Sequence, residues 1–193
     1  MATTVQSLLD RFDALMNDVG AVRWPTAERL MWVNDGQREL VTFKDDANTK
    51  TAILQTSVGA RQALPNTTDC YKIVGVRAGH TNRAVLPCDR AALDAFKPDW
   101  MADSNDDPVK NWMPDESPMA IWVYPSRLTG GDQMMITYVA YPPTVTEGAD
   151  SIGVRDAYST NVLHYMIYRA YSKDAETAGN AELAAAAYQL FRG

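Results

Sequence analysis

The sequence is poor in the side chains that most metal centres and nucleophilic sites use. Its 193 residues include 2 histidines and 2 cysteines. Neither His80 nor His164 has a neighbouring His, Cys or Glu at the spacing of a metal site, and His164 is best interpreted as a structural histidine. Cys70 and Cys88 have no CxxC spacing. A disulfide between them would require their two strands to pair, so buried free thiols are the simpler interpretation.

Known catalytic and nucleotide-binding motifs are also missing. The sequence has no Gly-x-Ser-x-Gly, no Walker phosphate loop and no Gly-x-Gly-x-x-Gly. The polar stretch 103–108 starts like a calcium loop, but Pro108 stands where that loop needs Gly and Pro114 stands where it needs Glu. We therefore expect a protein that is not an enzyme and that has no metal and no cofactor.

Long apolar runs and clusters of positive charge are absent too. No run approaches the roughly 20 apolar residues that cross a membrane, and the first residues do not resemble a secretion signal, so we expect no membrane association. The net charge is −6, from 18 basic and 24 acidic residues. Without clustered cations a tight grip on nucleic acid is not expected, although DNA could still slide past such a protein.

The chain begins and ends with helical patterns and has a β-rich middle. Apolar residues recur at helical spacing in 3–17, 26–43, 154–174 and 180–191. Between them, the short runs 49–57, 70–76, 83–87, 119–125 and 132–143 alternate with a period of two. Turn residues such as Gly59 separate them, and one short helix is expected from Ala91 to Phe96 with Asp89 as its cap. The fold class expected from this order is α+β: a four-helix bundle made by residues 1–46 and 151–193, with an inserted antiparallel β-rich domain at 47–150.

The helix predicted at 26–43 carries a turn-like sequence, Asn-Asp-Gly-Gln at 34–37, in its middle. The helical interpretation is preferred because it places apolar and charged residues on separate faces of the helix. A hairpin is not supported, because no alternating strands flank Asp35 and Gly36. Gly36 costs a helix about 1 kcal/mol relative to Ala and leaves a notch beside Trp32. Asn34 and Gln37 lie on an otherwise apolar face, where amides need partners. These four residues are therefore candidate interface residues of a helix with two neighbours, one of which could come from another subunit.

The long C-terminal helix has more apolar and aromatic surface than one buried face requires. Tyrosine suits interfaces because its ring is apolar and its hydroxyl is polar. Arg169 and Lys173 lie one turn apart, and two interpretations stay open: cations at a helix end, or partners for acidic groups across an interface. The candidate interface residues here are Tyr158, Tyr165, Tyr168, Arg169 and Lys173.

Two stretches, RWPTAERLMWVNDGQRELV and YRAYSKDAETAGNAELAAAAYQLF, resemble the head–tail adaptor (connector) proteins of tailed bacteriophages, in particular the short-tailed kind. The resemblance implies a structural virion protein at the head–tail interface, assembled in the host cytoplasm. It implies a homo-oligomeric ring, a dodecamer, that binds the portal protein and the tail nozzle or tail-tube protein. DNA would pass through its lumen without specific binding, for genome retention and ejection.

Two other interpretations compete with this one. The last two helices also look like one hairpin of a tetratricopeptide-like array, which would make the chain a non-catalytic protein-interaction module, although a single hairpin does not form a stable solenoid. A phage accessory protein is the other alternative. The mass in solution, with and without portal protein, separates a ring from either of these.

Overall fold

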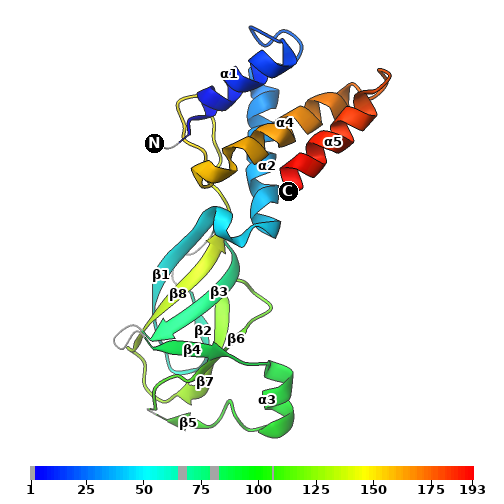
Figure 1. Cartoon of the computed structure of the whole chain (residues 1–193). Coiled ribbons are helices and arrows are strands. Elements are labelled where there is room, and N and C mark those ends of the chain that lie inside the picture. Colours follow the sequence, from blue (N-terminus) through cyan, green and yellow to red (C-terminus); the bar gives the residue numbers. More distant parts are fainter. Residues whose placement is uncertain (1–2, 65–68, 79–82, 106) are drawn as a thin grey trace. The chain divides into compact units, whose positions relative to one another are not determined.

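The computed structural model describes residues 3–64, 69–78, 83–105 and 107–193 (Figure 1). The chain divides into two compact units. Residues 1–48 and 141–193 form a helical unit, and residues 49–140 form a sheet unit. Within the described ranges, none of the helices combines the length and apolarity that a membrane crossing requires.

The helical unit is built from four α-helices and two short 3-10 turns. Its first helix begins after Thr4, whose hydroxyl accepts a hydrogen bond from the Ser7 N–H group, and ends at Asn17 in the left-handed conformation. The elements are α1 (Val5–Met16), α2 (Thr26–Phe43), η1 (Asp45–Asn48), η2 (Asp156–Tyr158), α4 (Ser159–Lys173) and α5 (Asn180–Arg192). Helix α2 therefore runs unbroken through its Asn-Asp-Gly-Gln sequence, as predicted.

Helix α4 lies at the centre of this unit, and the other three pack around it. It contacts α5 most extensively, then α2 and α1, whereas α1 and α2 touch little. The extended segment between β8 and α4 also belongs to this unit, and it is bound by side chains of α2. The expected four-helix bundle is wrong, because part of the surface that α2 would give to a neighbouring helix is covered by extended chain.

The sheet unit contains one mixed sheet and the fifth α-helix. The order of the strands is β1-β8-β3-β4-β6-β7-β2, with the two-residue strand β5 beside β7. The pairs β4–β6 and β5–β7 are parallel, so the expectation of an antiparallel insertion is also wrong. The elements are β1 (Thr49–Gln55), β2 (Gly59–Ala63), β3 (Cys70–Ala78), β4 (Ala84–Pro87), α3 (Arg90–Phe96), β5 (Ser104–Asn105), β6 (Asn111–Pro114), β7 (Ala120–Arg127) and β8 (Gln133–Ala140).

The sheet curls into a half-barrel. Strands β1 and β2 lie at opposite ends of the strand order, yet only residues 56–58 connect them, and the four steps from Gln55 to Gly59 span about 14 Å at most. The side chain of Gln62, which is fully buried, holds this corner. Its amide group donates to the carbonyl oxygens of Ser57 (3.0 Å) and Gly59 (2.7 Å) and accepts from the Ser57 N–H group (2.6 Å). The inner face is apolar, with Ile121, Val123 and Ile136 fully buried.

The loop between α1 and α2 is organised around one carboxylate. Asp18 accepts hydrogen bonds from the N–H groups of Val22 (3.1 Å), Arg23 (2.9 Å) and Trp24 (3.1 Å). The bond from Arg23 is the main cause that lowers the pKa of Asp18. By fixing the loop, the carboxylate places the buried Trp24 ring edge-on against Phe12, with 5.6 Å between centroids.

We expect Asp18→Asn to lower the midpoint of thermal unfolding near neutral pH and to weaken its dependence on acid. The pKa of Asp18 is lower in the folded than in the unfolded state. Its stabilisation is therefore present above the unfolded pKa and is lost as the pH falls through the folded pKa. Thermal unfolding across an acidic pH series measures this, with the exposed Glu176→Gln as a matched control. An acid dependence equal to that of the wild type would contradict the prediction.

Candidate interaction site of the helical unit

The four central residues of α2 contact two parts of the helical unit, the segment before α4 and α4 itself. Asn34 and Gln37 bind the extended segment that precedes α4, Asp35 pairs with a cation of α4, and Gly36 packs against an aromatic ring of α4. A sequence that is poor for an isolated helix is thus accommodated by tertiary contacts with α4 and with the segment before it.

The two amide side chains hold the segment between β8 and α4. Asn34 Nδ2 donates to the Val145 carbonyl oxygen (2.9 Å), and the Val145 N–H group donates back to Asn34 Oδ1 (2.8 Å). Gln37 is fully buried, and its Oε1 accepts from the Gly153 N–H group. A buried backbone group without a partner is costly, so these amides replace the hydrogen bonds that the extended segment would otherwise lack.

Gly36 provides the space for Tyr165 of α4. A Cβ atom at position 36 would lie 2.9 Å from Tyr165 Cδ1, which is too close, and 3.1 Å from Tyr165 Cβ, which is tight. Tyr165 is 5% exposed, and burial is the main cause that raises its pKa. The notch predicted at Gly36 therefore exists, and it is filled by this chain's own tyrosine.

Tyr165 belongs to a cluster of five aromatic rings from three helices. Its centroid lies 5.0 Å from that of Phe191 and 5.6 Å from that of Tyr168. Phe191 also lies edge-on to Phe43 (5.3 Å), and Tyr168 lies 4.9 Å from Tyr188. The aromatic surface that the sequence places on α4 is in large part used to join α2, α4 and α5.

The two candidate cations of α4 pair with acids of α2 inside the same chain. Lys173 Nζ lies 2.7 Å from Glu28 Oε2, and Arg169 Nη1 lies 3.3 Å from Asp35 Oδ2. The same Arg169 nitrogen donates to the Tyr165 hydroxyl (3.3 Å), and this bond is the main cause that raises the pKa of Arg169. Such partly exposed pairs contribute little stability each. The Arg169 and Lys173 side chains are 39% and 50% exposed, so a partner could reach both.

The candidate interface residues differ in how accessible they are. Those inside the packing of the helical unit are Trp32, Gly36, Gln37 and Tyr165, and those that are half-buried or exposed are Asn34, Tyr158, Tyr168, Arg169 and Lys173. The hydroxyl of Tyr158 donates to Asp46 Oδ1 (2.7 Å), and that bond is the main cause that raises the pKa of Tyr158. A role for any of them between subunits stays a prediction, and the accessible residues are the ones that a partner could touch.

The sequence-based reasoning overlooked the apolar residues that the last helix exposes. Leu183 is 47% exposed and Leu190 is 59% exposed on α5. Their spacing of seven residues places them on one side of the helix, beside the buried Ala184, Ala187 and Phe191. That spacing was visible in the sequence, but only the packing of α5 on α4 shows that the described residues leave this side uncovered.

The histidines and cysteines belong to no metal site in the described part of the chain. The described residues contain no group of three His, Cys, Asp or Glu side chains that could hold a metal ion. His164 is half-buried on α4, and His80 lies outside the described residues. Cys70 and Cys88 are free thiols, and burial raises the pKa of Cys70.

Enlarging Gly36 should destabilise the protein although it improves helix propensity. Gly36→Ala would gain about 1 kcal/mol in an exposed helix, but the clash with Tyr165 should turn this into a loss of about 1–3 kcal/mol, and Gly36→Leu should lose more. Denaturant unfolding measures the free energy of unfolding of both variants. Thr42→Ala, at an exposed position of α2, is the control for helix propensity.

A double-mutant cycle isolates the contact. In a Tyr165→Ala background the substitution Gly36→Ala should no longer destabilise, because the ring that its Cβ would strike is gone. Equal costs of Gly36→Ala with and without the Tyr165 ring would show that the ring is not the reason for the glycine.

Comparison with known proteins places the chain in a family. No curated protein matches the sequence. The family model described as SU10 adaptor protein matches residues 3–193, which covers both the helical unit and the sheet unit. The chain belongs to the SU10 adaptor protein family.

Proposed function

We propose that this protein is a structural adaptor of a tailed phage, whose copies form a ring between the portal protein and the tail. The observation that carries the proposal is the match to an adaptor family over residues 3–193. An adaptor role is structural and non-catalytic. The proposal goes further than the family match. It includes the ring, its dodecameric form, the portal and tail partners and a short-tailed virion.

The packing of the helical unit supports a role as a rigid connecting piece. Gly36, the least favourable residue of α2 for a helix, and the buried Gln37 are fixed by contacts with α4 and the segment before it. Helix α5 also exposes Leu183 and Leu190. A partner that covered them would gain about 25 cal/mol of binding free energy for each Å² of apolar surface buried. A rigid unit with an uncovered apolar helix side fits a protein that functions by being joined to others.

The net charge supports a lumen through which DNA moves without being held. Each copy carries −6, and the summed field of a ring of such copies would repel phosphates. In the described residues of the sheet unit, six of the cations already pair with acids, as Arg61 does with Asp115. Copies of this chain would therefore line a channel without binding the DNA tightly.

The mass of the protein in solution tests the proposal. We expect either a ring alone or a ring that forms when the portal protein is added, because a contact between two copies is strengthened when several copies close on one platform. Light scattering after size-exclusion chromatography, with and without portal, measures this. A monomer that portal does not change would instead favour a protein-interaction module or an accessory protein.

The exposed side of α5 should take part in these contacts. Leu183→Asp combined with Leu190→Asp should leave the fold intact, since both side chains are largely exposed, and should reduce binding to portal or to other copies. Met31→Asp, which changes an equally exposed residue on α2, is the matched control. Circular dichroism checks the fold. Normal assembly and normal portal binding by the double variant would show that α5 is not part of the interface.

A further inference from the structure

Strand β1 forms one edge of the sheet, and its outer side is open. It pairs with β8 in unbroken register from Thr49 to Gln55, and it stands at one end of the strand order (Figure 1). Among the residues that the structure describes, no strand pairs with the other side of β1. An open edge presents a row of N–H and C=O groups to which another strand can bind.

The ladder shows which backbone groups of β1 face outward. The Thr56 N–H group, directly after the strand, donates to the Asp132 carbonyl oxygen (2.9 Å), so these two residues form a hydrogen-bonded pair. Opposite residues of antiparallel strands alternate between bonded and non-bonded pairs, so the even-numbered residues of β1 bond to β8. The N–H and C=O groups of the odd-numbered residues therefore point away from β8, and three of these residues are Thr51, Ile53 and Gln55.

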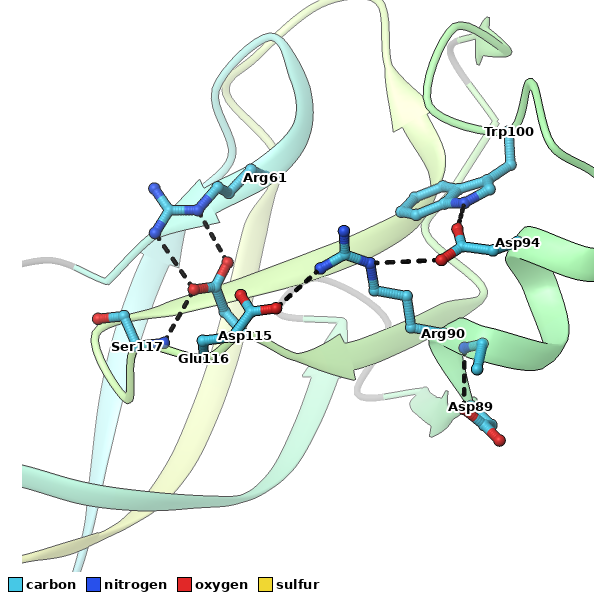
Figure 2. A network of polar contacts seen from close by, with 9 residues as sticks. Arg61, Asp89, Arg90, Asp94, Trp100, Asp115, Glu116 and Ser117 are labelled. Atoms are coloured by element: carbon cyan, nitrogen blue, oxygen red, sulfur yellow. Dashed lines mark hydrogen bonds and ion pairs between the residues drawn. The ribbon is translucent and has the colours of Figure 1, made fainter.

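Strand β1 lacks the features by which natural edge strands avoid pairing, such as proline, bulges and exposed charge. Residues 51–55 contain no proline and no charged side chain, and their register with β8 is regular. Lys50, just before them, already pairs with Asp69 (2.6 Å). The edge strand β2 differs, because its register with β7 shifts before Arg61 and this cation bonds to Asp115 at 2.8 Å (Figure 2).

The side chains make the edge of β1 complementary to itself. Ile53 is 51% exposed, and the exposed Thr51 and Gln55 stand on either side of it. When two such strands pair antiparallel about a two-fold axis at Ile53, Ile53 lies opposite Ile53 and Thr51 lies opposite Gln55. Each of these pairs exchanges two backbone hydrogen bonds. Apolar pairs across strands are stabilising, and no like charges meet.

We propose that two copies of this chain associate through their β1 edges, antiparallel, with Ile53 on the two-fold axis. The partner is a second copy because β1 supplies both the outward backbone groups and the matching side chains that this edge requires. A ring is built from head-to-tail contacts, whereas this contact is symmetric. The inference therefore goes beyond the proposed function, and it concerns copies that are not yet part of a ring.

Proline substitutions test which edge is used. Ile53→Pro removes an N–H group that points away from β8, so the bonds to β8 are kept. We expect the wild type to dimerise as its concentration rises, and Ile53→Pro to associate several-fold more weakly, in sedimentation equilibrium. Ala63→Pro on β2 is the matched control, because the next residue, Leu64, bonds to Met119 and the Ala63 N–H group thus faces outward. Circular dichroism checks both folds.

Cross-linking gives a second readout that needs no proline. Ile53→Cys is prepared in full-length Cys88→Ser protein, where the remaining Cys70 is buried. The Cα atoms of a hydrogen-bonded antiparallel pair lie about 5.5 Å apart, which a disulfide can span. On mild oxidation Ile53→Cys should give several-fold more disulfide-linked dimer than Val74→Cys, which changes a similarly exposed residue of β3.

The outcomes separate the alternatives. A monomeric wild type would overturn the contact, and so would equal association of the wild type and folded Ile53→Pro, or equal disulfide yields from the two cysteine variants. Association that Ala63→Pro also abolishes would indicate pairing of β1 with β2 and would overturn the symmetric contact. If Ile53→Pro does not fold, the cysteine variants decide.

The same measurements keep this inference apart from the proposed function. A dimer through β1 in a protein that portal does not change would leave the β1 contact standing and would remove the adaptor role. A ring formed with portal, from copies whose association does not depend on Ile53, would support the adaptor role and overturn the β1 contact.

Discussion

The contact between Gly36 and Tyr165 is the constraint on which the helical unit depends. Tyr165 can reach the surface of α2 only because position 36 has no Cβ, and it then meets Phe191 and Tyr168. Through these rings α5, which touches α2 only near its C-terminal end, is tied to the centre of the unit. The low helix propensity of glycine is thus offset by the packing of several rings at once.

The two amide side chains of α2 explain why the arrangement of the helices was predicted wrongly. A helix face that carries Asn34 and Gln37 cannot simply pack against an apolar helix, because both amides need hydrogen-bond partners. Here the partners are backbone groups of Val145 and Gly153, in a segment with no helical pattern of its own. The amides were recognised in the sequence as a feature to be explained, but they were assigned to an interface rather than to this segment.

In the sheet unit, too, the sequence indicated the elements better than it indicated which elements pair. Alternation in the sequence located β1, β3, β4, β7 and β8, and Asp89 marked the start of α3, where its side chain caps Ala91. Strands β2 and β6 were missed, because their runs are short and Gly59 was interpreted as a turn. Alternation also says nothing about direction, so the parallel pairs could not be foreseen.

The sequence by itself determined the bounds of α2, the order of helical and β-rich segments, and the resemblance to adaptor proteins, because these depend on local periodicity and on strings of residues. Only the tertiary structure decided which groups meet. It showed that Arg169 and Lys173 pair with α2, that Tyr165 fills the notch, and that Phe96 and Leu190 stay uncovered. The physical reason is that burial and pairing depend on residues distant in the chain, which the pattern of a single segment does not specify.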